Sequence, residues 1–472
     1  MPSVEIPHAP GLSRRTLLKG GVALGATLTV AGTLSQDRRA VAATPNLRVG
    51  VIGGGMAGLE TAWLLDGTHN VTLLEQDAVL GGHAQTVSVE VGGATRQVDV
   101  GAQYFSQQTY PNFWKLVTST LGVPVVKANM SIALWNHGAT ALEFFSPEPF
   151  GNLTNALSML AFTNAVQADW AGLDRRGTGS WDVTLRDYLD SRLIAKSSKD
   201  RFLYPFLAAL NGASTEENKA VAARGGVAFL ARPTTIINYQ PYPYHNVRDG
   251  LRAVADAMLS QLTTTEVRTG TEIVGLAKAG AEFVATDASG RQYRFDQVVL
   301  ALPPVPAKRL VAGLGSGGAN IATIYERQPY FRATTAVHTE PTYQHPNPSK
   351  WASYNARNDG EYCEASMWYG AIQDQVAGLP IFKSWTTHRR EAPGGVLATA
   401  EYWHPNITPA FIGAQRSLDA LQGRDGIWFA GTHTYDVDSQ ESALVSACRV
   451  AQRLAPDSTR LRALAPKIKQ VW

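Results

Sequence analysis

The sequence predicts an α/β fold built around a parallel sheet, and three consecutive segments near the start of the chain support this prediction. Residues 47–52 (LRVGVI) form a short apolar run typical of a buried strand. This run leads directly into GGGMAG and then into an apolar helical pattern at residues 59–65. A second apolar run, residues 70–74, ends in Glu75. The strand–helix–strand order predicts a Rossmann-like unit whose two strands are parallel.

The glycines between the first strand and the helix have the spacing that a dinucleotide requires. Gly53 permits a tight turn, Gly55 lets the backbone approach a pyrophosphate, and Gly58 lets the helix pack closely on the strand. The helix N-terminus then directs its unpaired N–H groups at the phosphates. Glu75 is placed to bind the ribose hydroxyls. We therefore predict a dinucleotide site, which also includes Met56 and Ala57; the alternative is a glycine-rich turn in another α/β fold.

Five residues after Glu75 the chain reads GGHAQT, and there it resembles a known superfamily. The Gly81 and Gly82 pair resembles the second fingerprint of the flavin amine oxidase and phytoene desaturase superfamily, in which these glycines lie against the FAD pyrophosphate. Further segments follow in the superfamily's order: VDVGAQYF (98–105), TEIVGL (271–276) and DQVVLALPP (296–304). The resemblance implies that the dinucleotide is FAD.

The resemblance also implies further FAD contacts. His83 would lie beside the phosphates, and the backbone of Val274 would meet the adenine. The closing segment, residues 426–451, resembles the motif in which a strand ends and the next helix directs its N-terminus at the flavin. The contacts implied in this segment are Gly431, Thr432, Glu441, Ser442 and Ala443.

The implied architecture is an amine oxidase-like two-domain flavoprotein, in which a Rossmann-like FAD-binding domain carries an inserted mixed α+β substrate domain. We expect the FAD-binding domain to be discontinuous, with parts at residues 46–110, 246–310 and 416–460. The substrate domain would comprise residues 111–245, which read mostly as helix, and residues 311–415, which read as sheet. Residues 461–472 would form a C-terminal tail.

Candidate catalytic residues are few. His338 and His404 fall in the predicted substrate sheet, where they could act as acid/base or orienting groups; the alternative is a hydrogen-bonded structural histidine. His433, just after the closing strand, could contact the cofactor. Nine aromatic residues crowd the same sheet, and we expect two or three of them to wall an apolar substrate cavity. They are Trp351, Tyr354, Tyr362, Trp368, Tyr369, Phe382, Trp385, Tyr402 and Trp403.

Three departures from the superfamily's pattern bear on the chemistry. His83 stands where the superfamily has an arginine, and Thr432 stands where it has an acid, so the electrostatic grip on FAD should be looser. Many amine oxidases carry a lysine that holds a water at flavin N5, and residues 334–338 (TTAVH) contain none. A cationic amine would also need a carboxylate or an aromatic cage, which the sequence does not assign. The missing lysine and the unassigned carboxylate favour hydride removal from carbon.

We therefore predict an FAD-dependent oxidoreductase that acts on a small apolar organic substrate, at a carbon–carbon or carbon–nitrogen bond. A closer resemblance is to predicted NAD/FAD-binding flavoproteins associated with cyclopropane fatty acid synthases, which points toward lipids. It is carried by residues 109–124, AVHTE (336–340), WASYNAR (351–357) and the pair His404-Pro405. The alternatives are a redox-neutral FAD-dependent double-bond isomerase of a lipid and a non-catalytic flavin-binding scaffold.

The first 43 residues resemble a twin-arginine (Tat) signal peptide. Residues 13–19 read SRRTLLK, an uncharged run follows at residues 21–34, and AVA at residues 40–42 offers a cleavage site. The alternative is a basic N-terminus before a membrane anchor, but the run is shorter than the roughly 20 apolar residues that a span requires. We expect the Tat machinery as a partner, a periplasmic or extracellular location, and no stable span in the mature chain.

Charge and cysteine content exclude other classes of protein. The chain has 42 Lys and Arg against 39 Asp and Glu, and residues 1–43 account for the whole net charge of +3. The remaining chain is neutral and offers no electrostatic footprint for nucleic acid. Two cysteines, Cys363 and Cys448, are too few for a disulfide framework, and the sequence has no metal-binding motif, so no metal is expected.

Overall fold

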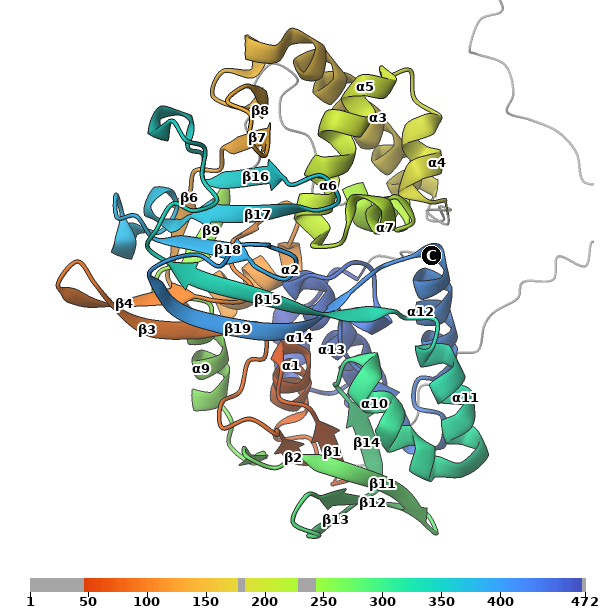
Figure 1. The fold of residues 1–472 in the computed structure, drawn as a ribbon. Coiled ribbons are helices and arrows are strands. Elements are labelled where there is room, and N and C mark those ends of the chain that lie inside the picture. The colour runs from red at the N-terminus through yellow and green to blue at the C-terminus, as the bar shows by residue number, and fades with distance from the viewer. Residues whose placement is uncertain (1–45, 177–182, 228–242, 469–472) are drawn as a thin grey trace, which may run out of the picture. The chain divides into compact units, whose positions relative to one another are not determined.

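The computed structural model describes residues 46–176, 183–227 and 243–468 (Figure 1). The predicted signal peptide, residues 1–43, lies outside the described residues. Within the described residues, no helix is long and apolar enough to cross a membrane.

A five-stranded parallel sheet forms the centre of the nucleotide-binding part, as the fold class predicted. Its strand order is β10-β2-β1-β14-β20. The strands are β1 (Arg48–Ile52), β2 (Asn70–Leu74), β10 (Glu266–Arg268), β14 (Gln297–Leu300) and β20 (Ile427–Phe429). The central strand β1 is buried on both faces, which explains its nearly continuous apolar run.

Helices and a small sheet cover the two faces of this parallel sheet. One core joins Val49 and Val51 to the helices α1 (Met56–Leu65), α9 (Arg252–Ser260) and α13 (Gln440–Leu454). The other joins Ile52 to a second set of elements. These are the antiparallel strands β11 (Ile273–Ala279), β12 (Glu282–Asp287) and β13 (Gln292–Phe295), and the helices α10 (Pro304–Val311), α11 (Gly315–Tyr325) and α12 (Pro409–Leu421).

A seven-stranded sheet dominates the substrate domain. Its order is β19-β15-β18-β17-β16-β7-β8, and every neighbouring pair is antiparallel except β16 with β7. The strands are β7 (Ile132–Asn136), β8 (Leu142–Phe145), β15 (Tyr330–His338), β16 (Tyr354–Asn358), β17 (Cys363–Trp368), β18 (Phe382–Trp385) and β19 (Val396–Pro405). In Figure 1 the long strands β15 and β19 lie side by side at the edge of the sheet nearest the nucleotide-binding part.

Helices of the substrate domain come from the segment predicted to be mostly helical. They are α3 (Leu153–Arg176), α4 (Leu185–Asp190), α5 (Lys196–Ser198), α6 (Tyr204–Asn211), α7 (Thr215–Lys219) and α8 (Ala223–Val227). Helix α2 (Pro111–Lys115), from the same segment, packs instead into the core around α1 and α13. The same segment also supplies β6 (Val125–Ala128), β7 and β8, which the sequence analysis did not predict. These strands are four or five residues long, too short for a two-residue period to stand out.

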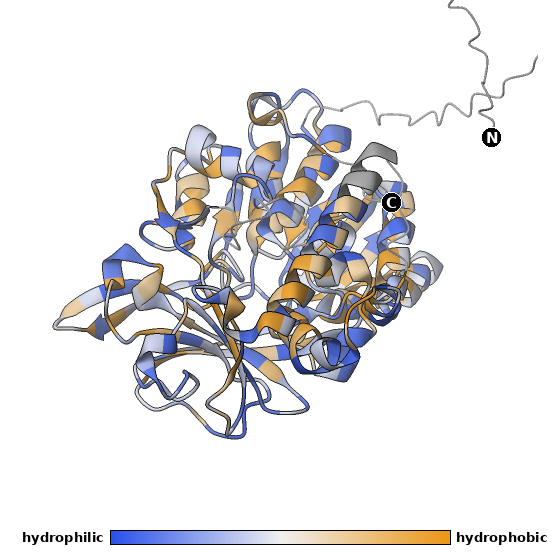
Figure 2. Ribbon diagram, turned by 90° about the horizontal axis from the view of Figure 1, so that it is seen from above, coloured by the Kyte–Doolittle hydropathy of each residue, from blue (hydrophilic) through white to orange (hydrophobic). Residues whose placement is uncertain are grey.

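Smaller elements complete the fold. Strands β3 (Thr86–Val91) and β4 (Ala94–Asp99) form a hairpin, and β5 (Phe105–Ser106) and β9 (Tyr244–Val247) form a three-stranded sheet with β6. Helix α14 (Thr459–Leu464) follows α13. The helices in Figure 2 carry apolar and polar residues next to one another, as expected of helices that bury one face.

Asp66 joins three distant segments of the nucleotide-binding part. It lies at the C-terminal end of α1, and its carboxylate accepts hydrogen bonds from the backbone N–H and hydroxyl groups of Thr263, Thr264 and Thr265, at 2.8–3.0 Å. Arg460 of α14 forms an ion pair with it at 3.1 Å. Burial would raise the pKa of Asp66, but the threonine hydrogen bonds hold it well below its usual range.

Candidate active site

A cavity of about 1070 Å³ is lined by residues that follow the carboxyl ends of β1, β2, β14 and β20 and by one face of the seven-stranded sheet. The carboxyl edge of a parallel α/β sheet is where such folds bind ligands. The first glycine motif, Glu75 and the closing segment all contribute to the wall of this cavity. The structure therefore brings together motifs that are separated by almost 400 residues of sequence.

Each glycine of the first motif has a distinct steric reason. Gly53 has φ +104°, and a Cβ on Gly58 would lie 1.9 Å from the carbonyl oxygen of Gly53. A Cβ on Gly53 would also lie 2.5 Å from the carbonyl oxygen of Ala301, so neither position admits a side chain. Gly55 is different: a Cβ there would meet no atom within 4 Å, and the residue lines the cavity. Its side-chain position is open space that a ligand can occupy.

The second glycine pair lies against the first motif. The N–H of Gly81 donates to the carbonyl oxygen of Gly54 at 2.9 Å, and a Cβ on Gly82 would lie 3.1 Å from the Cα of Gly55. Together the two segments form a backbone cradle without side chains. Met56 and Ala57, at the start of α1, also line the cavity beside it.

Glu75 and Val274 line the same part of the cavity. The carboxylate of Glu75 accepts from the N–H of Gly54 at 2.5 Å and from the N–H of Asp77 at 2.8 Å, and burial raises its pKa. It therefore holds the two loops at this end of the cavity in place. Val274 lies on β11 and is 53% exposed, so its backbone and side chain are open to a ligand.

The closing segment contributes only part of its predicted contacts. Gly431, Thr432 and Ala443 line the cavity. Glu441 and Ser442 do not: the carboxylate of Glu441 instead accepts from the N–H groups of Asn112 and Phe113, at the start of α2. An acid at a helix N-terminus satisfies its unpaired N–H groups. The prediction that Glu441 and Ser442 face the cofactor is therefore corrected.

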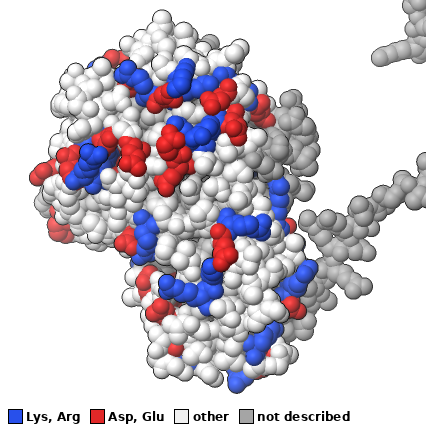
Figure 3. Space-filling model, turned by 45° about the vertical axis from the view of Figure 1, so that its right-hand side comes forward, with Lys and Arg blue, Asp and Glu red and all other residues white. Residues whose placement is uncertain are grey.

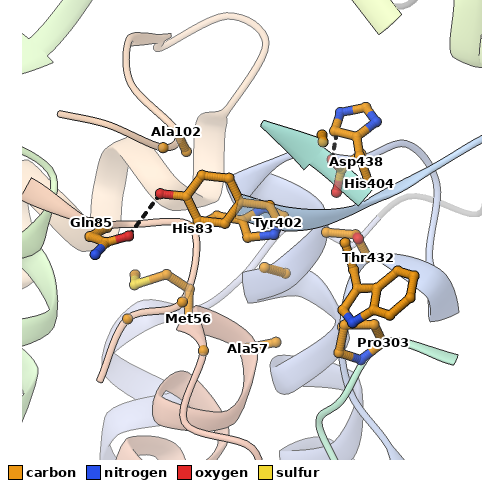
Figure 4. A pocket seen from close by; sticks show the side chains of 18 of the residues that line it. Met56, Ala57, His83, Gln85, Ala102, Pro303, Tyr402, His404, Thr432 and Asp438 are labelled. Carbon is orange, nitrogen blue, oxygen red and sulfur yellow. Dashed lines mark hydrogen bonds and ion pairs between the residues drawn. The ribbon is translucent and has the colours of Figure 1, made fainter. Parts of the chain in front are cut away.

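His83 lies in the cavity wall beside Tyr402. Their ring centroids are 4.6 Å apart, and the hydroxyl of Tyr402 donates to Oε1 of Gln85 at 2.9 Å (Figure 4). Burial lowers the pKa of His83, so the side chain is a neutral hydrogen-bonding group at neutral pH. The looser electrostatic grip on FAD stays a prediction.

His404 faces Asp438 across the cavity wall (Figure 4). Its Nε2 lies 3.5 Å from Oδ2 of Asp438, and the ring of Trp385 packs edge-on against it, with centroids 5.1 Å apart. Burial lowers the pKa of His404, while the charge of Asp438 opposes that shift. The Nδ1 atom is buried without a hydrogen-bond partner in the described residues. His404 can therefore offer a ring nitrogen to a ligand.

His338, the second candidate, is not brought to the cavity. It is fully buried, with Nδ1 2.8 Å from the carbonyl oxygen of Glu340 and Nε2 2.7 Å from Oγ of Ser384. Side chains alternate along β15, and Thr335 rather than His338 lines the cavity. Burial lowers the pKa of His338 to about 4. The structure corrects this candidate to a buried structural histidine.

His433 does line the cavity, as expected. It is 2% exposed, and its Nε2 has no hydrogen-bond partner among the described residues. Burial lowers its pKa to about 3. A neutral ring with an unpaired nitrogen is a candidate contact for a polar ligand atom.

Lys383 on β18 lines the cavity and was not predicted. It pairs in register with Val337 of β15, and its Nζ donates to the carbonyl oxygen of Gly101. Burial lowers its pKa to about 8, although the charge of Asp99 opposes the shift. The strand at residues 334–338 indeed lacks a lysine. The neighbouring strand β18 supplies a lysine to the same cavity. The argument against amine oxidation that rested on a missing lysine is therefore corrected.

Apolar side chains form the far wall of the cavity. Four of the nine aromatic residues, Tyr354, Trp385, Tyr402 and Trp403, lie in this lining. Phe382 and Tyr369 are fully buried outside it. Further apolar residues of the lining lie on or next to the strands β7 and β17 and the helix α6, among them Met130, Ile132, Phe206, Leu210 and Met367. The wall is suited to a ligand with a hydrocarbon portion.

The cysteines are buried, and the surface carries charges of both signs. Cys363 and Cys448 are buried and unpaired, and the described residues contain no group of His, Cys, Asp or Glu that could hold a metal ion. On the face drawn in Figure 3, basic and acidic side chains are interspersed. Among the described residues, many charged side chains form ion pairs, such as Arg332 with Glu401 and Lys350 with Glu148.

Comparisons with known proteins agree with this geometry. The model of a family described as flavin containing amine oxidoreductase matches residues 56–347, more than half of the chain. A search of curated proteins found no match.

Solved structures resemble the fold over most of the chain. The fatty acid isomerase from P. acnes that produces CLA covers 87% of this chain and 99% of its own length, with 13% identity and a TM-score of 0.65. Putrescine oxidase bound to putrescine covers 87% and 100%, with 14% identity and a TM-score of 0.60. A candidate protoporphyrinogen oxidase from Exiguobacterium sp. 255-15 covers 88% and 99%, with 16% identity and a TM-score of 0.59.

Proposed function

The chain belongs to the flavin-containing amine oxidoreductase family. We propose that it removes a hydride from an apolar organic substrate and, from the resemblance of residues 1–43 to a Tat signal peptide, that it is exported. It is an FAD-dependent oxidoreductase with an amine oxidase-like fold. The apolar wall that continues from the glycine cradle is the observation that supports the substrate class. A non-catalytic scaffold is disfavoured because the lining extends beyond the glycine cradle to apolar residues of the substrate domain, such as Ile132 and Phe206.

The residues of the cavity fit FAD. The open Cβ position of Gly55 and its close contact with Gly82 leave a cradle of backbone N–H groups for a pyrophosphate. Glu75 and Val274 would hold the nucleotide end, and Thr432 and Ala443 would lie beside the remainder. When bound, the flavin supplies a hydride acceptor, and the protein supplies binding, orientation and electrostatics.

In this proposal His404 is the proton-handling residue. It is the only one of the two candidate histidines in the cavity wall, and its Nδ1 is free of a partner in the described residues. Asp438 stands 3.5 Å from the other ring nitrogen and stabilises the protonated form. The pair would therefore accept a proton from the substrate carbon or orient the substrate for hydride removal.

Two alternatives are supported by specific observations. A redox-neutral double-bond isomerase of a lipid is consistent with the apolar wall and with the likeness to a fatty acid isomerase. Oxidation of an amine is consistent with Asp438, a cavity carboxylate that the sequence analysis did not assign, and with the likeness to putrescine oxidase. Segments that resemble flavoproteins associated with cyclopropane fatty acid synthases, such as residues 109–124, favour a lipid.

The test is anaerobic reduction of the purified flavoprotein by unsaturated fatty acids, terpenoids and primary amines. We expect lipids or terpenoids to bleach the flavin absorbance, and the His404→Ala variant to slow that reaction about 100-fold, a typical contribution of general acid–base catalysis. His338→Ala serves as the matched histidine outside the cavity and should leave the reduction rate unchanged. Fast reduction by amines with inert lipids would restore amine oxidation, whereas conversion of a lipid without flavin bleaching would indicate the isomerase.

Export through the Tat pathway is tested by the arginine pair. The double variant Arg14→Lys and Arg15→Lys keeps the charge but removes the predicted recognition pair. We expect folded, flavin-containing precursor to accumulate in the cytoplasm, measured by cell fractionation and by the length of the chain. The variant Arg38→Lys, within the same segment, is the control. Normal export and trimming of the double variant would rule out the Tat pathway.

A further inference from the structure

Lys383 is the one buried lysine or arginine in the described part of the cavity wall, and it lacks an ion pair there. Lys383 is 6% exposed, and no ion pair among the described residues includes it. An ammonium has three donors, and one of these is used by the carbonyl oxygen of Gly101. Two donors are therefore left for a ligand.

The nearest carboxylate does not neutralise this lysine. Asp99 is 1% exposed, and its Oδ1 already accepts from the hydroxyl of Thr86 at 2.6 Å and from the N–H of Leu251 at 2.8 Å. It influences Lys383 through its charge but forms no ion pair with it in the described residues. A buried cation without a partner is costly, and an anion that enters the cavity would remove that cost.

The neighbours of Lys383 on the adjoining strands are apolar. Val337 and Met367 are its register partners on the two neighbouring strands, and both are buried. Met367 belongs to the cavity lining, together with Ile132 and Phe206. Tyr354 adds its ring, while its hydroxyl donates to the carbonyl oxygen of Ala209. The wall thus offers one positive charge next to hydrocarbon.

We propose that Lys383 binds the carboxylate of an amphipathic carboxylic acid whose hydrocarbon chain lies along this apolar wall. The inference rests on the proposed function, since it narrows the apolar substrate to one with an acidic head. A single ammonium neutralises a monoanion, whereas a dianionic phosphate would keep an unpaired charge in a buried site. The same cation disfavours a protonated amine at this position.

The test compares three ligands that have the same ten-carbon chain and differ in the charge of the head group: decanoate, decan-1-ol and decylamine. Each is titrated into the FAD-loaded wild-type protein, and its dissociation constant is measured by perturbation of the flavin spectrum and by calorimetry. We expect decanoate to bind at least about tenfold more tightly than decan-1-ol, the size of a single charge-assisted hydrogen bond, and decylamine to bind most weakly.

The variant Lys383→Met keeps the length of the side chain and removes the charge. It should lose the preference for decanoate and keep the affinity for decan-1-ol, while Lys383→Arg should keep the preference. Lys350→Met, which removes a lysine paired with Glu148, is the control and should behave as wild type. If Lys383 contacts the flavin instead of the ligand, Lys383→Met will shift the flavin reduction potential and keep the preference for decanoate. That result would overturn the proposal.

Failure of this inference is distinguishable from failure of the proposed function. Tight binding of decan-1-ol without any preference for decanoate in the wild type would refute the role of Lys383 and leave the apolar substrate in place. If none of the three ligands binds, or if decylamine binds best, both the carboxylate site and the apolar substrate class are wrong.

Discussion

Replacing Gly55 with valine is expected to give a folded protein that retains less FAD than the wild type. The backbone of Gly55 is extended, with φ −62° and ψ 175°, which valine adopts without strain. A Cβ there meets no protein atom within 4 Å, so the apoprotein has room for the side chain. The space it would fill is the cavity beside the cradle. Forcing extra carbon atoms into a packed contact costs about 1–3 kcal/mol, so FAD affinity should fall about 10- to 100-fold.

The measurement is the ratio of flavin to protein absorbance after purification, with circular dichroism to confirm the fold. Gly317→Val is the matched control, since Gly317 also faces open space but lies exposed on α11, away from the cavity. Valine also has a higher helix propensity than glycine there. A Gly55→Val protein with the wild-type flavin content would contradict the assignment of the cradle.

The nucleotide-binding part was predictable because its constraints are local in sequence. The strands at residues 48–52 and 70–74 were predicted within one residue of their observed limits. Gly53 and Gly58 have no space for a side chain, so their spacing reports the turn geometry directly. Such a motif indicates both the fold and the edge of the sheet at which the ligand binds.

The substrate side of the cavity was less predictable because it depends on which face of a strand each side chain occupies. His338 and Thr335 lie on opposite faces of β15, and the sequence around them, TTAVH, mixes polar and apolar residues without an alternation that would show which face is which. Lys383 belongs to FKSW, a four-residue strand with buried residues on both faces. Its position beside the cavity follows from pairing with β15, a contact between residues 46 positions apart.

Asp438 and Glu441 show a second reason why part of the site could not be predicted from the sequence. Both lie in the closing segment, and the family pattern assigned the cofactor to the helix start at Glu441. The structure instead uses Glu441 to satisfy the N-terminus of α2, and it is Asp438, before the helix, that reaches the cavity. The side chain that takes each role depends on a neighbouring helix that is over 300 residues away in sequence.

Replacing Asp66 with asparagine is expected to lower the free energy of unfolding by a large amount. The carboxylate of Asp66 receives hydrogen bonds from three threonines and an ion pair from Arg460, and its side chain is 1% exposed. An amide NH₂ group in its place would face these donors. Breaking a buried charged contact costs about 3–5 kcal/mol, so the free energy of unfolding should fall by that amount at pH 7.

The effect of Asp66→Asn should depend on pH in a defined direction. The pKa of Asp66 is held well below its usual range in the folded protein, so its contribution is fully present above the unfolded value of about 3.9 and is lost as pH falls toward the folded value. Urea unfolding followed by circular dichroism should therefore show a large difference from wild type at pH 7 that shrinks below about pH 4. Asp256→Asn removes an exposed acid that forms an ion pair with Arg252, and should cost at most about 0.5 kcal/mol. A difference between wild type and Asp66→Asn that stays constant down to pH 3 would mean that packing, rather than the ionised carboxylate, holds α1 to the strand that follows Thr265.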